Sequence, residues 1–283
     1  MEIKTIGVVG CGIMGSGIAQ VCAQSGRQVV VSDLNEELLN RGLASVNSIL
    51  SSRVEKGKMS QQDKDAIVGR ITGTTDMKAF SVCDFVIEAV IENLEVKKQV
   101  FAELDKVSRK EVILSTNTSS MSIIDIAMAT GKPDKVAGMH FNNPAPVMRI
   151  LEIVRSIVTS DETLQECKEL GQALGKTIVV APDVPGFIGA RLATPYIMHA
   201  IRMLESGIGS REDIDNSMTL GFNHPMGPLA LVDLIGLDTE LNLATYLYDE
   251  LKEPQYAPPV LLKKMVAAGK LGRKSGKGFY DYS

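Results

Sequence analysis

The stretch Ile3-Lys4-Thr5-Ile6-Gly7-Val8-Val9-Gly10-Cys11-Gly12-Ile13-Met14-Gly15 joins an apolar run to a glycine-rich turn. A helix-compatible segment, Ser16 to Ser25, follows, so strand, turn and helix come in the order of a dinucleotide-binding unit. There the first glycine permits the turn, the second lets the backbone approach a pyrophosphate, and the third lets helix pack on strand. A glycine-rich turn without a ligand is the alternative. We predict that the dinucleotide contacts are Gly10, Gly12, Ile13, Met14 and Gly15.

An acidic residue follows the next apolar run, about 20 residues further along the chain. The run is Gln28-Val29-Val30-Val31-Ser32, and it ends at Asp33. The Asp33 carboxylate can accept hydrogen bonds from the adenosine ribose hydroxyls, whereas a 2′-phosphate would meet its like charge. Leu34-Asn35 supplies no arginine for such a phosphate. The sequence therefore favours NAD over NADP as cofactor.

Short apolar runs alternate with helical patterns over the first two thirds of the chain. This alternation predicts an α/β fold with a Rossmann-type, doubly wound, mostly parallel sheet. Ala181-Pro182-Asp183-Val184-Pro185-Gly186 then breaks the pattern, and only helical segments follow. We predict an NAD-binding domain over residues 1–182 and an all-α substrate and dimerisation domain over residues 183–283. The strand-like runs span residues 3–9, 29–32, 85–90, 112–115, 136–139, 149–154 and 177–180.

Composition describes an ordinary globular protein. The 283 residues suffice for two cores, and 45% are hydrophobic against 23% charged. No apolar run approaches the roughly 18 residues that span a bilayer, and a formal net charge of −4 gives no global attraction to nucleic acid or an anionic membrane. The chain starts directly with a strand, so we expect no signal peptide and a cytoplasmic location. Four scattered cysteines and three histidines suggest no metal site.

The segment that opens the second domain is apolar on nearly every side. It runs from Gly186 to Met198, which suits a helix buried against more than one partner. We therefore expect a homodimer formed through the C-terminal domain.

His140 is the strongest candidate for a general acid/base. It ends the run Lys135-Val136-Ala137-Gly138-Met139, at the sheet edge where ligands of such folds bind. Glu152 lies in an apolar run, and a carboxylate there needs a partner. If the intervening chain doubles back, Glu152 can orient the imidazole; a solvent-facing carboxylate is the alternative. Asn117-Thr118-Ser119-Ser120 follows another strand at that edge, where it can bind the substrate oxygen or cap the next helix.

Taken together, these residues resemble the L-3-hydroxyacyl-CoA dehydrogenase family, and within it the short bacterial 3-hydroxybutyryl-CoA dehydrogenases. The likeness extends over essentially the whole chain. The matching motifs are Gly10-Cys11-Gly12-Ile13-Met14-Gly15-Ser16-Gly17-Ile18-Ala19, Glu88-Ala89-Val90-Ile91-Glu92-Asn93, Ser115-Thr116-Asn117-Thr118-Ser119-Ser120, Gly138-Met139-His140-Phe141-Asn142-Asn143-Pro144, Asp183-Val184-Pro185-Gly186-Phe187, Asn223-His224-Pro225-Met226-Gly227-Pro228, and Gly272-Arg273-Lys274-Ser275-Gly276-Lys277-Gly278-Phe279-Tyr280.

The resemblance implies reversible, NAD-dependent oxidation of a (3S)-3-hydroxyacyl-CoA to the 3-oxoacyl-CoA. It makes His140 the acid/base, Glu152 its partner, and Ser119 a donor to the 3-oxygen. Lys56 and Lys58 lie in a basic stretch that loosely matches the position expected to bind the CoA phosphates. The residues expected around NAD are Asp33, Glu92, Lys97, Asn117, Ser119, Asn143 and Lys274.

Two positions depart from the family pattern. Ala190 stands where the family usually has an asparagine that helps to bind the substrate oxygen, and Asn142 stands where a phenylalanine is usual. We hypothesise that Asn142 reshapes the substrate pocket and replaces the lost amide. Other substrates stay open, namely a cyclic acyl-CoA or a free hydroxy acid, because a Rossmann fold does not fix the substrate. A low-turnover NAD-binding protein with a structural or sensing role is the alternative from another class.

Overall fold

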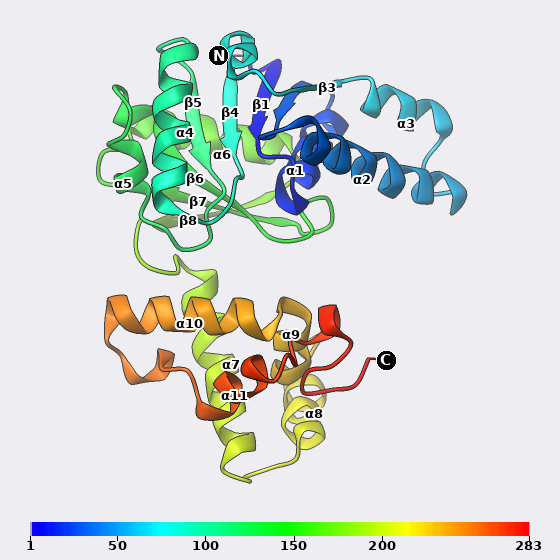
Figure 1. Ribbon diagram of the computed structural model, residues 1–283, viewed down its shortest axis with the longest axis vertical. Helices are drawn as coiled ribbons and strands as arrows, with labels where there is room; N and C mark the ends of the chain where they lie inside the picture. Colours follow the sequence, from blue (N-terminus) through cyan, green and yellow to red (C-terminus); the bar gives the residue numbers. More distant parts are fainter. Residues whose placement is uncertain (1, 283) are drawn as a thin grey trace. The chain divides into compact units, whose positions relative to one another are not determined.

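Strand β1 (Thr5–Val9) and helix α1 (Ile13–Gln24) enclose the glycine turn in the computed structural model, which describes residues 2–282 (Figure 1). The chain divides into two compact units, the first ending at Val184 and the second beginning at Pro185. The boundary predicted after residue 182 lies two residues before this division. No helix within the described residues combines the length and the apolar character needed to cross a bilayer.

The first unit is built on an eight-stranded sheet with the order β3-β2-β1-β4-β5-β6-β7-β8. Neighbouring strands are parallel except β6 and β7, which are antiparallel. The predicted doubly wound, mostly parallel sheet is confirmed. The other strands are β2 (Gln28–Ser32), β3 (Ile71–Thr74), β4 (Phe85–Glu88), β5 (Ile113–Thr116), β6 (Val136–Phe141), β7 (Ile150–Arg155) and β8 (Thr177–Pro182).

Helices flank this sheet, and most of them begin at a residue whose side chain caps the first turn. Such a side-chain oxygen accepts a hydrogen bond from an amide that has no partner within the helix. Asn35, Asn93 and Ser160 do so for α2, α4 and α6. The remaining helices of the unit are α2 (Glu36–Glu55), α3 (Gln61–Val68), α4 (Leu94–Val107), α5 (Ile123–Ala127) and α6 (Asp161–Ala173).

Central strands of the sheet are buried on both faces. Ile6 and Val8 of β1, with Phe85 and Ile87 of β4, are fully inaccessible to solvent. This is why these strands read as continuous apolar runs in the sequence instead of alternating between apolar and polar residues. The sequence analysis did not predict β3 or α3, because β3 reads Ile-Thr-Gly-Thr and α3 is short and weakly periodic.

The second unit is helical, as predicted. Within residues 185–282 the only β contacts are isolated bridges, Gly272 with Lys277 and Lys277 with Asp281. Its core contains Ile197, Met198 and Ile201 of the first helix packed with residues of the later ones. The helices are α7 (Gly189–Glu205), α8 (Arg211–Gly221), α9 (Pro228–Ile235), α10 (Leu237–Leu251) and α11 (Val260–Ala267).

Short 3-10 turns complete the chain in both units. They are η1 (Met77–Val82), η2 (Pro133–Lys135), η3 (Pro254–Tyr256) and η4 (Arg273–Ser275).

Candidate active site

The three glycines of the first turn have the geometry that dinucleotide binding requires. Gly10 has φ +95°, and a β-carbon there would lie 2.6 Å from the carbonyl oxygen of Ala89. A β-carbon on Gly15 would lie 1.8 Å from the carbonyl oxygen of Gly10, so only glycine lets α1 approach β1 this closely. A β-carbon on Gly12 would meet no atom within 4 Å. The backbone at Gly12 therefore faces open space that a pyrophosphate can enter.

Helix α1 begins at this open space. Its N-cap residue is Gly12, and no side chain accepts a hydrogen bond from the first turn. The amides of Ile13 and Met14 belong to that turn, where an anion is stabilised by backbone donors and by the helix dipole. The loop therefore fits the pyrophosphate of NAD, and the residues that would hold it come from the glycine turn itself.

Asp33 connects the end of β2 to the glycine turn. Its Oδ2 accepts a hydrogen bond from the Cys11 amide at 2.8 Å, and its Oδ1 accepts one from the Leu34 amide at 2.7 Å. These contacts hold the carboxylate beside the loop, the position from which it can accept ribose hydroxyls. Burial, and then the charge of Asp33, raise the pKa of the Cys11 thiol to about 11. Cys11 is therefore a neutral, packed thiol at neutral pH and not a nucleophile.

His140 and Glu152 form a pair across two antiparallel strands. The chain reverses after β6, so that His140 lies directly opposite Glu152 of β7. The imidazole Nδ1 is 2.9 Å from Glu152 Oε2, and the Glu152 side chain is only 3% exposed. The solvent-facing alternative for Glu152 is therefore wrong. An ionised carboxylate only accepts hydrogen bonds, so the neutral imidazole carries its proton on Nδ1 and keeps Nε2 as the acceptor.

Ser119 faces the other nitrogen of the same ring. Its hydroxyl oxygen is 3.2 Å from His140 Nε2, and it comes from the loop that follows β5. Capping of the next helix, the alternative reading of this loop, is carried out by Ser122, which accepts a hydrogen bond from the Asp125 amide of α5. Residues from β7, from β6 and from the loop after β5 thus form one line of contacts, from Glu152 through His140 to Ser119.

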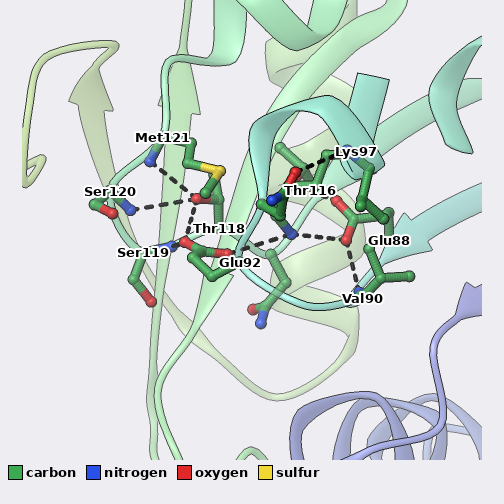
Figure 2. Close-up of polar contacts among 12 residues, drawn as sticks. Glu88, Val90, Glu92, Lys97, Thr116, Thr118, Ser119, Ser120 and Met121 are labelled. Atoms are coloured by element: carbon green, nitrogen blue, oxygen red, sulfur yellow. Dashed lines mark hydrogen bonds and ion pairs between the residues drawn. The ribbon is translucent and has the colours of Figure 1, made fainter. Parts of the chain in front are cut away.

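Glu92 anchors the Ser119 loop (Figure 2). Its Oε1 accepts hydrogen bonds from the Thr118 hydroxyl at 2.5 Å and from the Ser119 amide at 2.8 Å. Its Oε2 is 3.3 Å from the ammonium of Lys97. Lys97 also contacts Glu88 at 2.7 Å, and the side chains of both are completely buried. Glu92 therefore links a buried ion pair to the loop that carries Ser119.

Other predicted residues lie at the ends of the strands or on the surface. The Asn117 side-chain oxygen accepts a hydrogen bond from the Phe141 amide at 2.8 Å, which ties the ends of β5 and β6 together. Asn142 is half-buried and Asn143 is exposed in the β6–β7 connection. Lys56 and Lys58 are exposed just beyond α2.

Lys274 belongs to the second unit. Its ammonium is 2.5 Å from Asp238 Oδ1, a contact that lowers the pKa of that carboxyl against the opposing effect of burial. The role of Lys274 toward NAD stays a prediction.

The sequence analysis did not identify Glu88 as a residue of the candidate site. Glu88 follows Phe85-Val86-Ile87 and precedes Ala89, so it is a single carboxylate within an apolar run. The same signal drew attention to Glu152. Applied to β4, it would have found the second buried carboxylate, which accepts a hydrogen bond from the Thr116 hydroxyl at 2.6 Å.

Comparison with known proteins gives matches over the whole chain. The family model "3-hydroxyacyl-CoA dehydrogenase, NAD binding domain" matches residues 5–184, and "3-hydroxyacyl-CoA dehydrogenase, C-terminal domain" matches residues 186–282. A protein of Deinococcus radiodurans named "Probable 3-hydroxybutyryl-CoA dehydrogenase" is 46% identical and covers 98% of this chain and 99% of its own. The 3-hydroxybutyryl-CoA dehydrogenase of Mycobacterium tuberculosis is 44% identical, with 99% of each chain covered.

Solved structures agree with these matches. The crystal structure of (S)-3-hydroxybutyryl-CoA dehydrogenase from Ralstonia eutropha has a TM-score of 0.95 to this chain at 43% identity, and each chain is covered in full. Both the sequence and the fold of this chain are therefore similar to those enzymes from end to end.

Proposed function

This chain belongs to the 3-hydroxyacyl-CoA dehydrogenase family, whose members are NAD-dependent oxidoreductases, and we propose that its substrate is (3S)-3-hydroxybutyryl-CoA, oxidised reversibly to acetoacetyl-CoA. The names of its relatives support the four-carbon acyl chain, and the (S) designation of the Ralstonia enzyme supports the configuration at C3. The line of contacts from Glu152 through His140 to Ser119 carries the proposal, because it supplies a proton acceptor with an orienting partner on one side and a hydroxyl on the other.

The residues of the chain handle the proton of the reaction. Ile13 and Met14 of the glycine turn, together with Asp33, would hold NAD, and the bound cofactor would supply the acceptor for the hydride at C3 of the substrate. Neutral His140 takes the proton of the 3-hydroxyl on Nε2 and returns it in the reverse direction. Glu152 holds Nδ1–H and stabilises the imidazolium that forms, while the Ser119 hydroxyl donates to the substrate oxygen.

The proposal is tested by NADH oxidation at 340 nm with acetoacetyl-CoA as substrate. We expect rapid turnover with NADH, slower turnover with NADPH because of Asp33, and a loss of about 100-fold or more in kcat for His140→Ala. Tight NADH binding without turnover would contradict the proposal and favour the low-turnover alternative.

Free acetoacetate and cyclic 3-oxoacyl-CoA thioesters serve as the comparison substrates. Saturable turnover of the free acid, or a higher kcat/KM for a cyclic thioester, would contradict the assignment of 3-hydroxybutyryl-CoA. In the same assay, a gain of about tenfold for Ala190→Asn together with no effect of Asn142→Phe would overturn the idea that Asn142 replaces the lost amide.

We also propose an oligomeric state for this chain. The chain forms a homodimer through its helical unit, where apolar side chains such as Leu220 and Phe222 are exposed. A cytoplasmic location and CoA binding by Lys56 and Lys58 stay predictions of the sequence. Cell fractionation tests the first, and the KM for acetoacetyl-CoA in a Lys56→Ala/Lys58→Ala variant tests the second.

A further inference from the structure

Three charged side chains form a relay from the core to the Ser119 loop (Figure 2). Glu88, at the end of β4, and Lys97, in α4, are completely buried and lie 2.7 Å apart. Lys97 also contacts Glu92 at 3.3 Å, and the Glu92 side chain is 41% exposed. We call Glu88, Lys97 and Glu92 the acid–lysine relay.

Each atom of the buried carboxylate has a partner. Glu88 Oε1 accepts hydrogen bonds from the Lys97 ammonium and from the Val90 amide, both at 2.7 Å, and Oε2 accepts one from the Thr116 hydroxyl. Lys97 cannot rotate to solvent while it is held this way. Its ammonium therefore presents a fixed positive charge to Glu92 from inside the protein.

A contribution to folding stability does not by itself explain the buried ion pair of Glu88 and Lys97. The desolvation cost of two buried charges commonly equals or exceeds their attraction, so packed apolar residues of similar volume often serve as well. A buried pair that fixes a third, half-exposed carboxylate does something that apolar residues cannot do. The Oε1 atom of that carboxylate accepts from the Thr118 hydroxyl and the Ser119 amide.

We propose that Glu88 and Lys97 are positioning residues, which act through Glu92 to hold Ser119 at its distance from His140. This inference rests on the proposed role of Ser119. Glu152 orients the imidazole from one side, and the acid–lysine relay sets the hydroxyl on the other. Lys97 acts from beneath the site, since its side chain is 0% exposed and its ammonium lies between two carboxylates.

The test variant is Glu88→Gln/Lys97→Met, which removes both buried charges and leaves neither one unpaired. Its control is Glu95→Gln/Lys98→Met, which removes the surface pair of the same charge types from the same helix. We expect kcat with acetoacetyl-CoA to fall about tenfold or more in the test variant, because small displacements of a reacting group are costly. Because the Lys97 side chain is 0% exposed, the Kd for NADH should stay within about twofold, whereas the direct contact of Lys97 with NAD that the family resemblance implies would weaken it. The control should match the native enzyme.

A double-mutant cycle with Ser119→Ala separates positioning from other effects. If the relay acts through Ser119, Glu88→Gln/Lys97→Met should lower kcat by no more than about twofold further in the Ser119→Ala background. If the losses in kcat from the two changes multiply, the positioning role of the acid–lysine relay is wrong, while the role of Ser119 is not contradicted. A weaker Kd for NADH with unchanged kcat would contradict the positioning role in the same way. Full kcat in Ser119→Ala would overturn both the relay and the proposed role of Ser119. If the double replacement does not fold, Glu88→Gln alone enters the same cycle with the same criteria.

Discussion

At the scale of single residues, the site depends on which proton each imidazole nitrogen carries. Glu152 is buried and opposes His140 across β6 and β7, so it selects the tautomer with the proton on Nδ1. That tautomer leaves Nε2, the nitrogen facing Ser119, able to accept a proton. The acid/base role of His140 therefore depends on a carboxylate twelve residues further along the chain.

Glu152→Gln tests this dependence. The amide group can donate to Nδ1 and so favour the wrong tautomer, and it cannot stabilise an imidazolium. We expect kcat to fall about 100-fold or more, with the Kd for NADH and the melting temperature close to native values. Steady-state rates at 340 nm beside a thermal melt provide the measurement. A kcat within about twofold of the native enzyme would show that orientation by Glu152 is not required.

At the scale of elements, two glycines serve different purposes where α1 packs against β1. Gly15 makes close packing possible, whereas Gly12 leaves space for a ligand. Gly12 is the N-cap of α1 and Gly15 lies three residues further, in the first turn of the helix, and only the structure around them distinguishes their roles.

The matched variants Gly12→Ala and Gly15→Ala should therefore behave differently. Gly15→Ala forces a methyl group against the Gly10 carbonyl and should lower the melting temperature strongly. Gly12→Ala should melt like the native protein but bind NADH about tenfold more weakly or worse, since its methyl group enters the space for the pyrophosphate. Calorimetry and NADH fluorescence titration measure the two effects. Native NADH affinity in Gly12→Ala would contradict the placement of the pyrophosphate.

Helix α10 carries a buried carboxyl that links stability to pH. Burial raises the pKa of Glu240 from 4.5 to about 7, and its Oε1 has no hydrogen-bond partner among residues 2–282. Because the folded state holds this proton more tightly than the unfolded state, the contribution of Glu240 to stability is lost as pH rises from about 4.5 to about 7.

Glu240→Gln should remove this contribution to the pH dependence. We expect its melting temperature to exceed the native value by about 3 °C or more at pH 8, and to differ little at pH 4.5. The exposed Glu250→Gln on the same helix serves as the control and should change neither value. Equal shifts of the Glu240→Gln variant at both pH values would rule out titration of this carboxyl as the cause.

At the scale of the whole molecule, the helical unit exposes large apolar side chains. Leu220, in the last turn of α8, is 83% exposed, and Phe222, the residue after the helix, is 72% exposed. Exposed apolar side chains that gather into a patch commonly mark a protein–protein interface. We therefore choose Leu220 and Phe222 for substitutions that should disrupt the proposed homodimer.

Sedimentation at micromolar concentration should give twice the 30.5-kDa mass of the chain. Charge repulsion and the cost of burying carboxylates should make Leu220→Glu/Phe222→Glu monomeric. Exposed Glu250→Gln again serves as the control. If the native protein sediments as a monomer, the proposed homodimer is wrong. If Leu220→Glu/Phe222→Glu sediments as a dimer, the interface lies elsewhere.

Much of this molecule followed from local sequence. The glycine turn, the acidic residue after β2 and the alternation of strands with helices each depend on neighbouring residues, so the Rossmann-type fold and NAD could be predicted from them. His140 and Glu152 also stood out, because each is a polar residue in or at the end of an apolar run. Short, polar β3 gave no such signal.

Tertiary structure alone decided how distant residues meet. The reversal after β6 fixed the register that places Glu152 against His140, and parallel pairing of β4 with β5 brought Glu88 beside Thr116. Lys97 reads in the sequence like an ordinary helical lysine, yet packing of α4 buries it completely. Burial and pairing depend on contacts between segments that are far apart in the chain, and a local sequence pattern does not show which of these segments meet.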